Sequence, residues 1–319
     1  MIAIEEEKDL LLERNVLRDR QMFKIIKKQD VNEGNINIRQ ETDVTDFKSN
    51  KLETAIAWKW QKDPNKKRDF LIPVGLGLEK YFVLTDMHFA RDVLAAITTL
   101  YCHNKPKNRT ITTTFLEICN YMGVSANGKT YEGISNSLTF LRAYTIRKHS
   151  VPLEKVKRGV KMGDIDFGFI DYSAVSTEII TPSGDIEPIP VSQRSVKIVF
   201  SSCYADLLEN SAVHIIPFAA ISAARNLPRR HIVPAKNIVY NLSARSGKKA
   251  RLKEATLIDI AGLRPERPSR GRKAINRILN NMQKLGIISF AVEANKDNQA
   301  IYSVQLITEK RATNSETTF

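Results

Sequence analysis

Cysteine is scarce in this 319-residue chain, which has three widely separated cysteines: Cys102, Cys119 and Cys203. An odd and dispersed set predicts neither a disulfide framework nor a zinc cluster, and it fits a reducing compartment. The five histidines also stand apart, without the His-x-His pair that a metal-dependent nicking enzyme needs, and each is expected on a loop or at the surface. Clustered carboxylates and a Gly-x-Ser-x-Gly motif are missing too. We therefore expect no metal, no cofactor and no catalytic residue.

A long apolar run is also absent. The longest, residues 212–224, is too short to cross a bilayer and is interrupted by His214 and Pro217. Three consecutive glutamates follow the first four residues, which excludes the basic-then-apolar order of a signal peptide. We expect a cytoplasmic protein with no membrane partner.

Acidic residues are rare in one segment, and the positive charge of the chain is concentrated there. The formal net charge of the whole chain is +14. Residues 225–277 hold fifteen Lys or Arg against three acids (Glu254, Asp259 and Glu266), a net charge of +12. A concentrated basic segment of this kind predicts a polyanionic partner, usually a nucleic acid.

The residues from Glu254 to Leu306 predict a helix, a turn, a second helix and a β-hairpin. A short apolar helix over 255–261 ends at Gly262, and a turn bracketed by prolines follows at 263–268. Ser269 is the expected N-cap of the second helix, and Gly286 its expected end. Its buried face is expected to hold Ile275, Ile278, Leu279, Met282 and Leu285. Two β-favouring runs, 287–294 and 299–306, then flank a polar turn.

The opposite face of the second helix is basic and carries no carboxylate. Its expected DNA-contacting residues are Arg270, Arg272, Lys273, Asn276, Arg277 and Asn280, with Lys284 on the same face. A helix fits the major groove, where Arg or Lys can bind guanine and Asn can bind adenine. We expect Lys296 at the hairpin tip and Lys248, Lys249 and Arg251 on the DNA backbone. The alternative is an ordinary helix with a solvated charged face.

The first half of the chain predicts a similar arrangement. A helix over 85–102 precedes a threonine-rich strand at 110–113, and Thr114 is expected to cap a helix that ends at Gly123. The next helix would bury its apolar residues, Tyr131, Ile134, Leu138 and Leu141. Its outward face is much less cationic, and the residues on it predicted to contact DNA are Lys129, Asn136 and Thr139. Residues 145–200 are expected to form a long β-hairpin or small sheet.

These patterns predict an α+β protein of two tandem winged helix-turn-helix domains, with an added β-hairpin in the first. The expected divisions are an N-terminal helix and polar linker at 1–50, a first domain at 51–225, a second at 226–308 and a flexible tail at 309–319. Residues 204–225 are expected to be helical, and a helix over 234–246 is expected to open the second domain.

One motif favours a different function. Residues 123–130, Gly-Val-Ser-Ala-Asn-Gly-Lys-Thr, match the Walker A pattern of ATPases. That pattern forms a phosphate cradle only where a buried strand feeds the loop. The preceding residues, 114–122, have helical periodicity, and no βαβ units surround them. We therefore treat a P-loop ATPase as the weaker alternative.

Several stretches resemble the plasmid replication initiator A family, iteron-binding initiators of theta replication with two winged helices. The matching stretches are Met122–Tyr131 leading into Leu138–Leu141, Val196–Ser201 followed by Tyr204, the pair Arg229 and Arg230, Ile238–Tyr240, and Arg245–Gly247. The chain departs from the family where Pro228 and Pro234 interrupt an arginine-rich helix. The resemblance implies binding to origin repeats on double-stranded DNA, opening of nearby duplex, recruitment of the host helicase and initiator, and a homodimer in some states.

The leading hypothesis is thus a non-enzymatic, sequence-specific DNA-binding initiator of plasmid replication. A transcriptional regulator with the same fold and no replication role is the alternative from another class. The sequence does not separate the two, because both need only helices that read DNA grooves.

Overall fold

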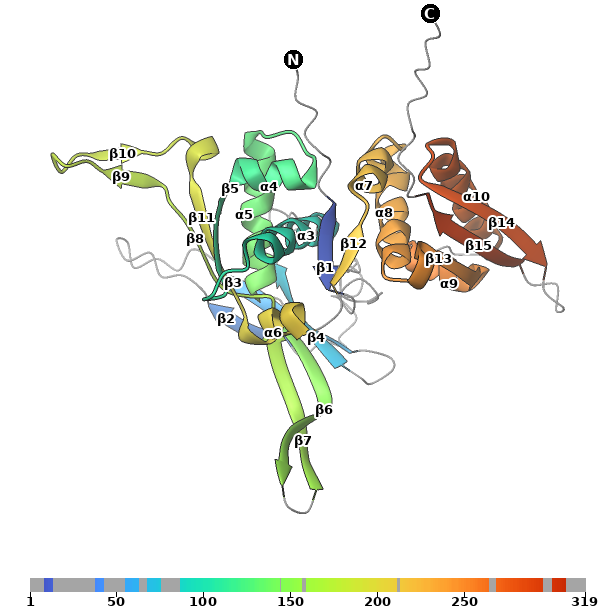
Figure 1. Cartoon of the computed structure of the whole chain (residues 1–319), viewed down its shortest axis with the longest axis horizontal. Helices are drawn as coiled ribbons and strands as arrows, with labels where there is room; N and C mark the ends of the chain where they lie inside the picture. Colours follow the sequence, from blue (N-terminus) through green and yellow to red (C-terminus); the bar gives the residue numbers. More distant parts are fainter. Residues whose placement is uncertain are drawn as a thin grey trace, which may run out of the picture. The chain divides into compact units, whose positions relative to one another are not determined.

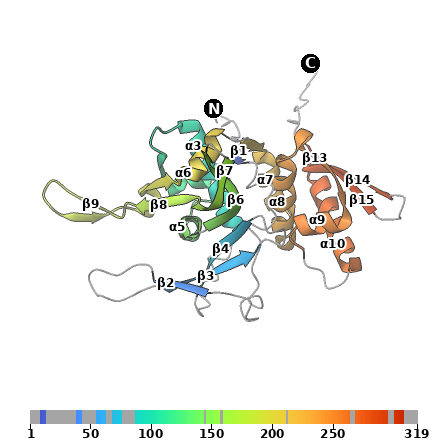
Figure 2. The same cartoon turned by 90° about the horizontal axis from the view of Figure 1, so that it is seen from below.

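The structure is a computed structural model that describes residues 9–13, 38–42, 55–62, 68–75, 87–143, 145–156, 159–210, 213–263, 268–294 and 300–307. The chain divides into two compact units. Residues Leu11–Val213 form the N-terminal unit, and His214–Phe319 with Met1–Leu10 form the C-terminal unit. Helices and strands occur in both (Figure 1, Figure 2), so the expected α+β class is confirmed. None of the described helices has the length and hydrophobicity needed to cross a membrane.

The N-terminal unit is built on three helices and a three-stranded antiparallel sheet with the strand order β5-β11-β8. These elements are α3 (Met87–Asn104), β5 (Thr110–Thr114), α4 (Phe115–Met122), α5 (Gly128–Ala143), β8 (Ile170–Val175) and β11 (Ser195–Phe200). Thr114 caps α4 as expected, because its hydroxyl accepts a hydrogen bond from the Glu117 amide at 3.1 Å. Gly123 ends α4 with φ 64°, a conformation that favours glycine.

The core of this unit lies where α5 packs beside α3 and the sheet. The apolar face predicted for α5 is buried, with Ile134 and Leu141 fully inaccessible to solvent. An aromatic cluster completes the core. The centroid of the Phe200 ring lies 4.8 Å from that of Tyr101 and 6.0 Å from that of Tyr204. Burial on this scale is the main favourable term in folding, so this cluster holds the end of β11 against α3 and α6 (Ser202–Asn210).

Among the described residues, further strands of the N-terminal unit form a five-stranded sheet and a separate hairpin, and β1 (Leu10–Glu13) pairs with β12 (Val213–Ile216). An antiparallel five-stranded sheet has the order β2-β3-β4-β6-β7, and β9 pairs with β10 in a separate hairpin (Figure 1). Their bounds are β2 (Ile38–Thr42), β3 (Ala55–Lys62), β4 (Arg68–Gly75), β6 (Thr145–Val156), β7 (Gly159–Gly168), β9 (Glu178–Ile180) and β10 (Ile186–Pro188), and a short 3-10 helix, η2 (Val191–Gln193), precedes β11. Residues 145–200 therefore belong to three sheets instead of one, because β6 pairs with the distant β4 as well as with β7.

The C-terminal unit repeats the plan with a sheet of order β13-β15-β14. Its elements are α7 (Phe218–Arg225), α8 (Arg229–Ser243), η3 (Ser246–Lys248), β13 (Lys249–Lys253), α9 (Glu254–Ile260), α10 (Pro268–Lys284), β14 (Ile288–Ala294) and β15 (Ala300–Leu306). The predicted hairpin is confirmed, with Ile288 opposite Leu306 and Ala294 opposite Ala300. The strand β13, which the sequence analysis missed, adds to the free edge of β15.

Helix α10 buries the face predicted from its periodicity. Ile275, Leu279 and Met282 are fully buried, whereas Leu285, also expected inside, is 42% exposed. Leu285 lies beyond the last helical residue, where Gly286 has φ 68° and turns the chain away. The Ile287 amide donates to the Met282 carbonyl at 3.0 Å, which closes the helix end in a Schellman motif. At the other end the helix begins at Pro268, one residue before the expected cap.

Several predicted boundaries differ from the structure. The two units divide between Val213 and His214, twelve residues before the predicted boundary at 225, so α7 belongs to the C-terminal unit. Helix α8 starts at Arg229, five residues before the predicted start at Pro234, and continues through that proline, which cannot donate a backbone hydrogen bond inside the helix. A strand, β12 (Val213–Ile216), interrupts the helix expected over 204–225.

The chain ends bear on two further predictions. The described part of the expected N-terminal helix, β1 (Leu10–Glu13), is a strand, and β2 lies in the expected linker. The tail at 309–319 lies outside the described residues.

Candidate nucleic-acid interface

The exposed side of α10 carries a stripe of polar and basic side chains, which we name the α10 stripe: Lys273, Arg277, Asn280 and Lys284. These four residues are spaced by four, three and four positions, so they share one helical face. All four side chains are exposed. Within the described part of the chain, no acidic side chain forms an ion pair with the three cations of the stripe. Exposed Lys and Arg side chains on a helix can bind phosphate, and in the major groove they can bind guanine.

The other basic residues predicted on α10 differ in their surroundings. Arg270 is exposed, in the first turn of the helix. The Arg272 guanidinium instead contacts the Glu254 carboxylate, with 2.5 Å between Nε and Oε2. Glu254 is the first residue of α9 and only 14% exposed at its side chain, so this pair holds α10 against α9. Arg272 is therefore a positioning residue for the α10 stripe and a weaker candidate for DNA contact.

Asn276 is also held by the protein. The Tyr302 hydroxyl, on β15, donates to the Asn276 Oδ1 atom at 2.8 Å. Burial raises the pKa of the Tyr302 phenol, and the nearby Glu254 carboxylate raises it further, so the hydroxyl keeps its proton as a donor. One lone pair of Asn276 Oδ1 is thus occupied. Asn280, which is exposed, is better placed to bind adenine through both its amide atoms.

The residues predicted to contact the DNA backbone lie around β13. Lys249 is exposed at its start, and Lys248 precedes it with φ 50° in the turn that follows Gly247. Arg251 donates instead from Nη2 to Glu293 Oε2 on β14 at 2.7 Å. An exposed ion pair of this kind contributes about 0–1 kcal/mol, so Arg251 can exchange this partner for a phosphate. Lys296 lies outside the described residues.

Helix α5 of the N-terminal unit presents a less basic face. Lys129 is exposed in its first turn, but the acidic Glu132 is exposed less than one turn later. Asn136 and Thr139 are half-buried, and the Thr139 hydroxyl donates to the Ser135 carbonyl at 3.2 Å. The three residues predicted here are therefore on one helix but do not form an exposed basic ridge.

The Walker-like segment is the turn between α4 and α5. A helix, not a strand, feeds it, and Gly123 ends that helix in the left-handed conformation. The Asn127 Oδ1 atom accepts a hydrogen bond from the Thr130 amide at 3.0 Å and so caps α5. A phosphate would need this amide to be free. The strand-to-helix cradle of a P-loop is not formed by these residues.

Similarity to known proteins is slight. No family model and no curated protein matches the chain. Among solved structures, a selenomethionine derivative of domains 2 and 3 of RctB matches with a TM-score of 0.44 and 10% identity, over 85% of this chain and 91% of that one. Another structure of RctB domains 2–3 matches with a TM-score of 0.43 and 11% identity, over 86% and 93%. Scores this low carry no functional argument, so function rests on the site itself.

A buried histidine behind the α10 stripe was missed by the sequence analysis. The expectation that histidines lie on loops or at the surface is wrong for His231, which is 5% exposed on α8, and for His88, which is 6% exposed on α3. His231 Nδ1 lies 3.0 Å from Asn281 Nδ2 and accepts a hydrogen bond from this amide when the ring is neutral. The amide hydrogen bond links α8 to α10. Its sequence signal was weak, since a lone histidine in a helix is common.

We expect the stability of the C-terminal unit to fall in mild acid because of His231. Burial lowers the pKa of the ring in the folded state below its ordinary value of 6.5, and the charges of Arg230 and Arg277 lower it further. As the pH falls below 6.5, His231 is therefore protonated in the unfolded chain before it is protonated in the folded protein. The free energy of unfolding decreases over this range until the folded ring also titrates. The slope contributed is at most about 1.4 kcal/mol per pH unit. Urea unfolding from pH 7.5 to 5 measures it.

The matched variant for this measurement is His231→Gln, which keeps a hydrogen-bond acceptor without a titrating ring. Its unfolding free energy should depend less on pH over the same range. An unchanged pH dependence in the variant would assign the effect to other groups.

Proposed function

We propose that this chain is a sequence-specific, non-enzymatic DNA-binding protein that initiates plasmid replication, and that each unit is a winged helix. The observation that carries the proposal is the α10 stripe, where exposed cations have no acidic partner among the described residues. The sequence resemblance to plasmid initiators supplies the replication role. It also adds origin repeats, host helicase and initiator proteins, and a second copy of the chain as proposed partners.

The order of elements supports the winged-helix part of the proposal. The C-terminal unit runs α8, β13, α9, α10, β14, β15. The N-terminal unit has the matching order α3, β5, α4, α5, β8, β11, with β6 and β7 inserted before β8 and with β9 and β10 inserted before β11. In both sheets the last strand lies between the other two, as β5-β11-β8 and β13-β15-β14. Helix–strand–helix–helix–strand–strand with this pairing places the third helix on one side of a hairpin, so α5 and α10 hold equivalent positions.

In this arrangement α10 would enter the major groove. A helix with its side chains is roughly 10–12 Å across, which matches a groove about 12 Å wide. Lys273 and Arg277 would bind guanine or phosphate, and Asn280 would bind adenine. Lys248 and Lys249 would contact the flanking backbone, where they position the protein and carry no sequence information.

The β9–β10 hairpin of the N-terminal unit is acidic. Residues 171–193, which include β9 and β10, contain no Lys or Arg and four acids: Asp171, Glu178, Asp185 and Glu187. A hairpin with only negative charge is repelled by phosphate, so we expect no DNA contact from this hairpin and propose α5 as the contacting element instead.

A footprint tests the proposal directly. The protein should protect repeated sequences in the DNA that flanks its gene, with a spacing set by the two units. Protection that is uniform along the fragment, without preferred sites, would reject sequence-specific binding. Normal maintenance of an origin-bearing replicon after deletion of the gene would leave DNA binding in place and favour the transcriptional regulator.

A further inference from the structure

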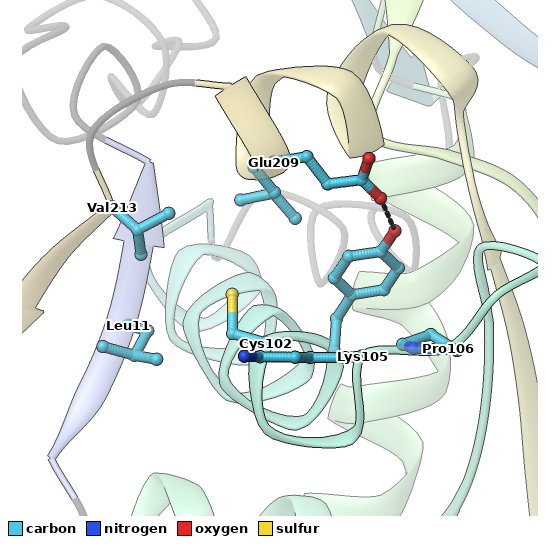
Figure 3. Close-up of a pocket in the computed structure, with 8 residues that line it drawn as sticks. Leu11, Cys102, Lys105, Pro106, Glu209 and Val213 are labelled. Atoms are coloured by element: carbon cyan, nitrogen blue, oxygen red, sulfur yellow. Dashed lines mark hydrogen bonds between the residues drawn. The ribbon is translucent and has the colours of Figure 1, made fainter.

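The N-terminal unit contains a cavity that the proposed DNA contacts do not use. Its volume is about 520 Å³, and it lies at the end of α3, between that helix, α6 and β1 (Figure 3). Small-molecule sites in proteins span roughly 300–1,000 Å³ and are mostly apolar with a few polar groups. The cavity falls in that range, so its lining decides what it could hold.

Most of the lining is apolar. Leu11, Leu208 and Val213 come from β1, α6 and β12, and the Tyr101 ring forms part of the wall. In Figure 3 the side chains of Leu11 and Val213 face the helix that carries Cys102. A hydrocarbon body would bury apolar surface against these side chains, which favours binding in proportion to the area removed from water.

The polar groups of the lining are of two kinds. The Tyr101 hydroxyl donates to Glu209 Oε1 at 3.1 Å, and burial together with this hydrogen bond raises the pKa of Tyr101 to about 12, so the phenol keeps its proton and this donor is already used. The Lys105 ammonium differs, because no ion pair joins it to an acid in the described part of the chain. It is the lining group that can bind a new anion.

Lys105 also has an unusual backbone. It follows the last residue of α3 with φ 44°, and its amide donates to the Tyr101 carbonyl at 2.9 Å. Glycine is the residue that this left-handed position at a helix end favours. A lysine held in such a position places its side chain along the cavity wall, under Cys102 in Figure 3.

We propose that this cavity binds a small monocarboxylic acid with an apolar body, with the carboxylate on Lys105 and the hydrocarbon against Leu11, Leu208 and Val213. The site is independent of the DNA-binding proposal. Leu11 and Val213 are the first and last residues of the N-terminal unit, so a bound ligand contacts both chain segments that leave it. Occupancy should therefore slow amide hydrogen exchange in β1 and β12.

Titration calorimetry with decanoate, decanol and decylamine tests the charge preference at constant chain length. Decanoate should bind once per chain and at least tenfold more tightly than decanol, with decylamine weakest. Lys105→Met should reduce decanoate affinity about tenfold, which corresponds to about 1.4 kcal/mol, and should leave decanol binding unchanged. Lys107→Met is the matched control, because Lys107 is exposed two residues further on and does not line the cavity.

A second variant tests the location. Cys102→Phe should fill the cavity and abolish binding of all three probes, with circular dichroism as the check on folding. If that variant does not fold, exchange protection of β1 and β12 by decanoate in the natural chain locates the site instead. Failure of decanoate to bind, equal affinity for decanoate and decanol, or an unchanged affinity in Lys105→Met would each overturn the proposal. DNA footprints are not involved, so either proposal can fail without the other.

Discussion

The variant with both Lys273 and Arg277 replaced by alanine should lose most of its specific affinity for DNA. Each side chain that reads a base is worth about 1–3 kcal/mol, and each that contacts phosphate contributes about 0.9 to the slope of log affinity against log salt. Loss of a base contact lowers the affinity for one sequence, whereas loss of a phosphate contact lowers the salt slope, so the two effects are distinguishable. Fluorescence anisotropy on the footprinted repeat, measured from low to moderate salt, gives the affinity and the slope together.

The matched control removes the same formal charge from the other unit. Lys107 and Lys197 are both exposed and lie outside α5 and α10, so the double alanine variant at these positions should change affinity little. Both pairs are surface residues, and such substitutions usually alter stability by less than about 0.5 kcal/mol. Equal losses in the two double variants would mean that net charge, and not the α10 stripe, drives binding.

The elements with strong local signals could be predicted from the sequence. The buried face of α10, the Thr114 cap and the Gly123 and Gly286 ends all follow from short-range spacing and backbone chemistry. Elements that depend on distant partners could not. β13 is a stretch of five residues, Lys-Ala-Arg-Leu-Lys, whose composition favours no strand, and it is ordered by pairing with β15 some fifty residues later.

The candidate site divides in the same way. Periodicity placed Lys273, Arg277 and Asn280 on one exposed face of α10, as the structure has them. It could not separate them from Arg272 and Asn276, whose partners Glu254 and Tyr302 come from α9 and β15. Which cations remain without a partner is a property of tertiary packing.

Replacing Phe200 by alanine should destabilise the N-terminal unit more than any surface change considered above. The ring is fully buried between Tyr101 and Tyr204, and removing it leaves a cavity that the surrounding sheet and helices cannot fill. Phenylalanine to alanine substitutions in a core cost about 3–5 kcal/mol. Scanning calorimetry should show a lower transition temperature for the N-terminal unit.

Tyr172→Ala is the matched control, because Tyr172 is an aromatic residue of the same sheet but is 50% exposed. It should cost about 1 kcal/mol or less, since little apolar surface is removed from the interior. The C-terminal unit has a core of its own around Ile275, Leu279 and Met282, so anisotropy with the repeat DNA should still detect binding by α10 in Phe200→Ala at low temperature. If both substitutions lowered the transition equally, Phe200 would not be the centre of this core. If Phe200→Ala removed all DNA binding, recognition would depend on the N-terminal unit as much as on the α10 stripe.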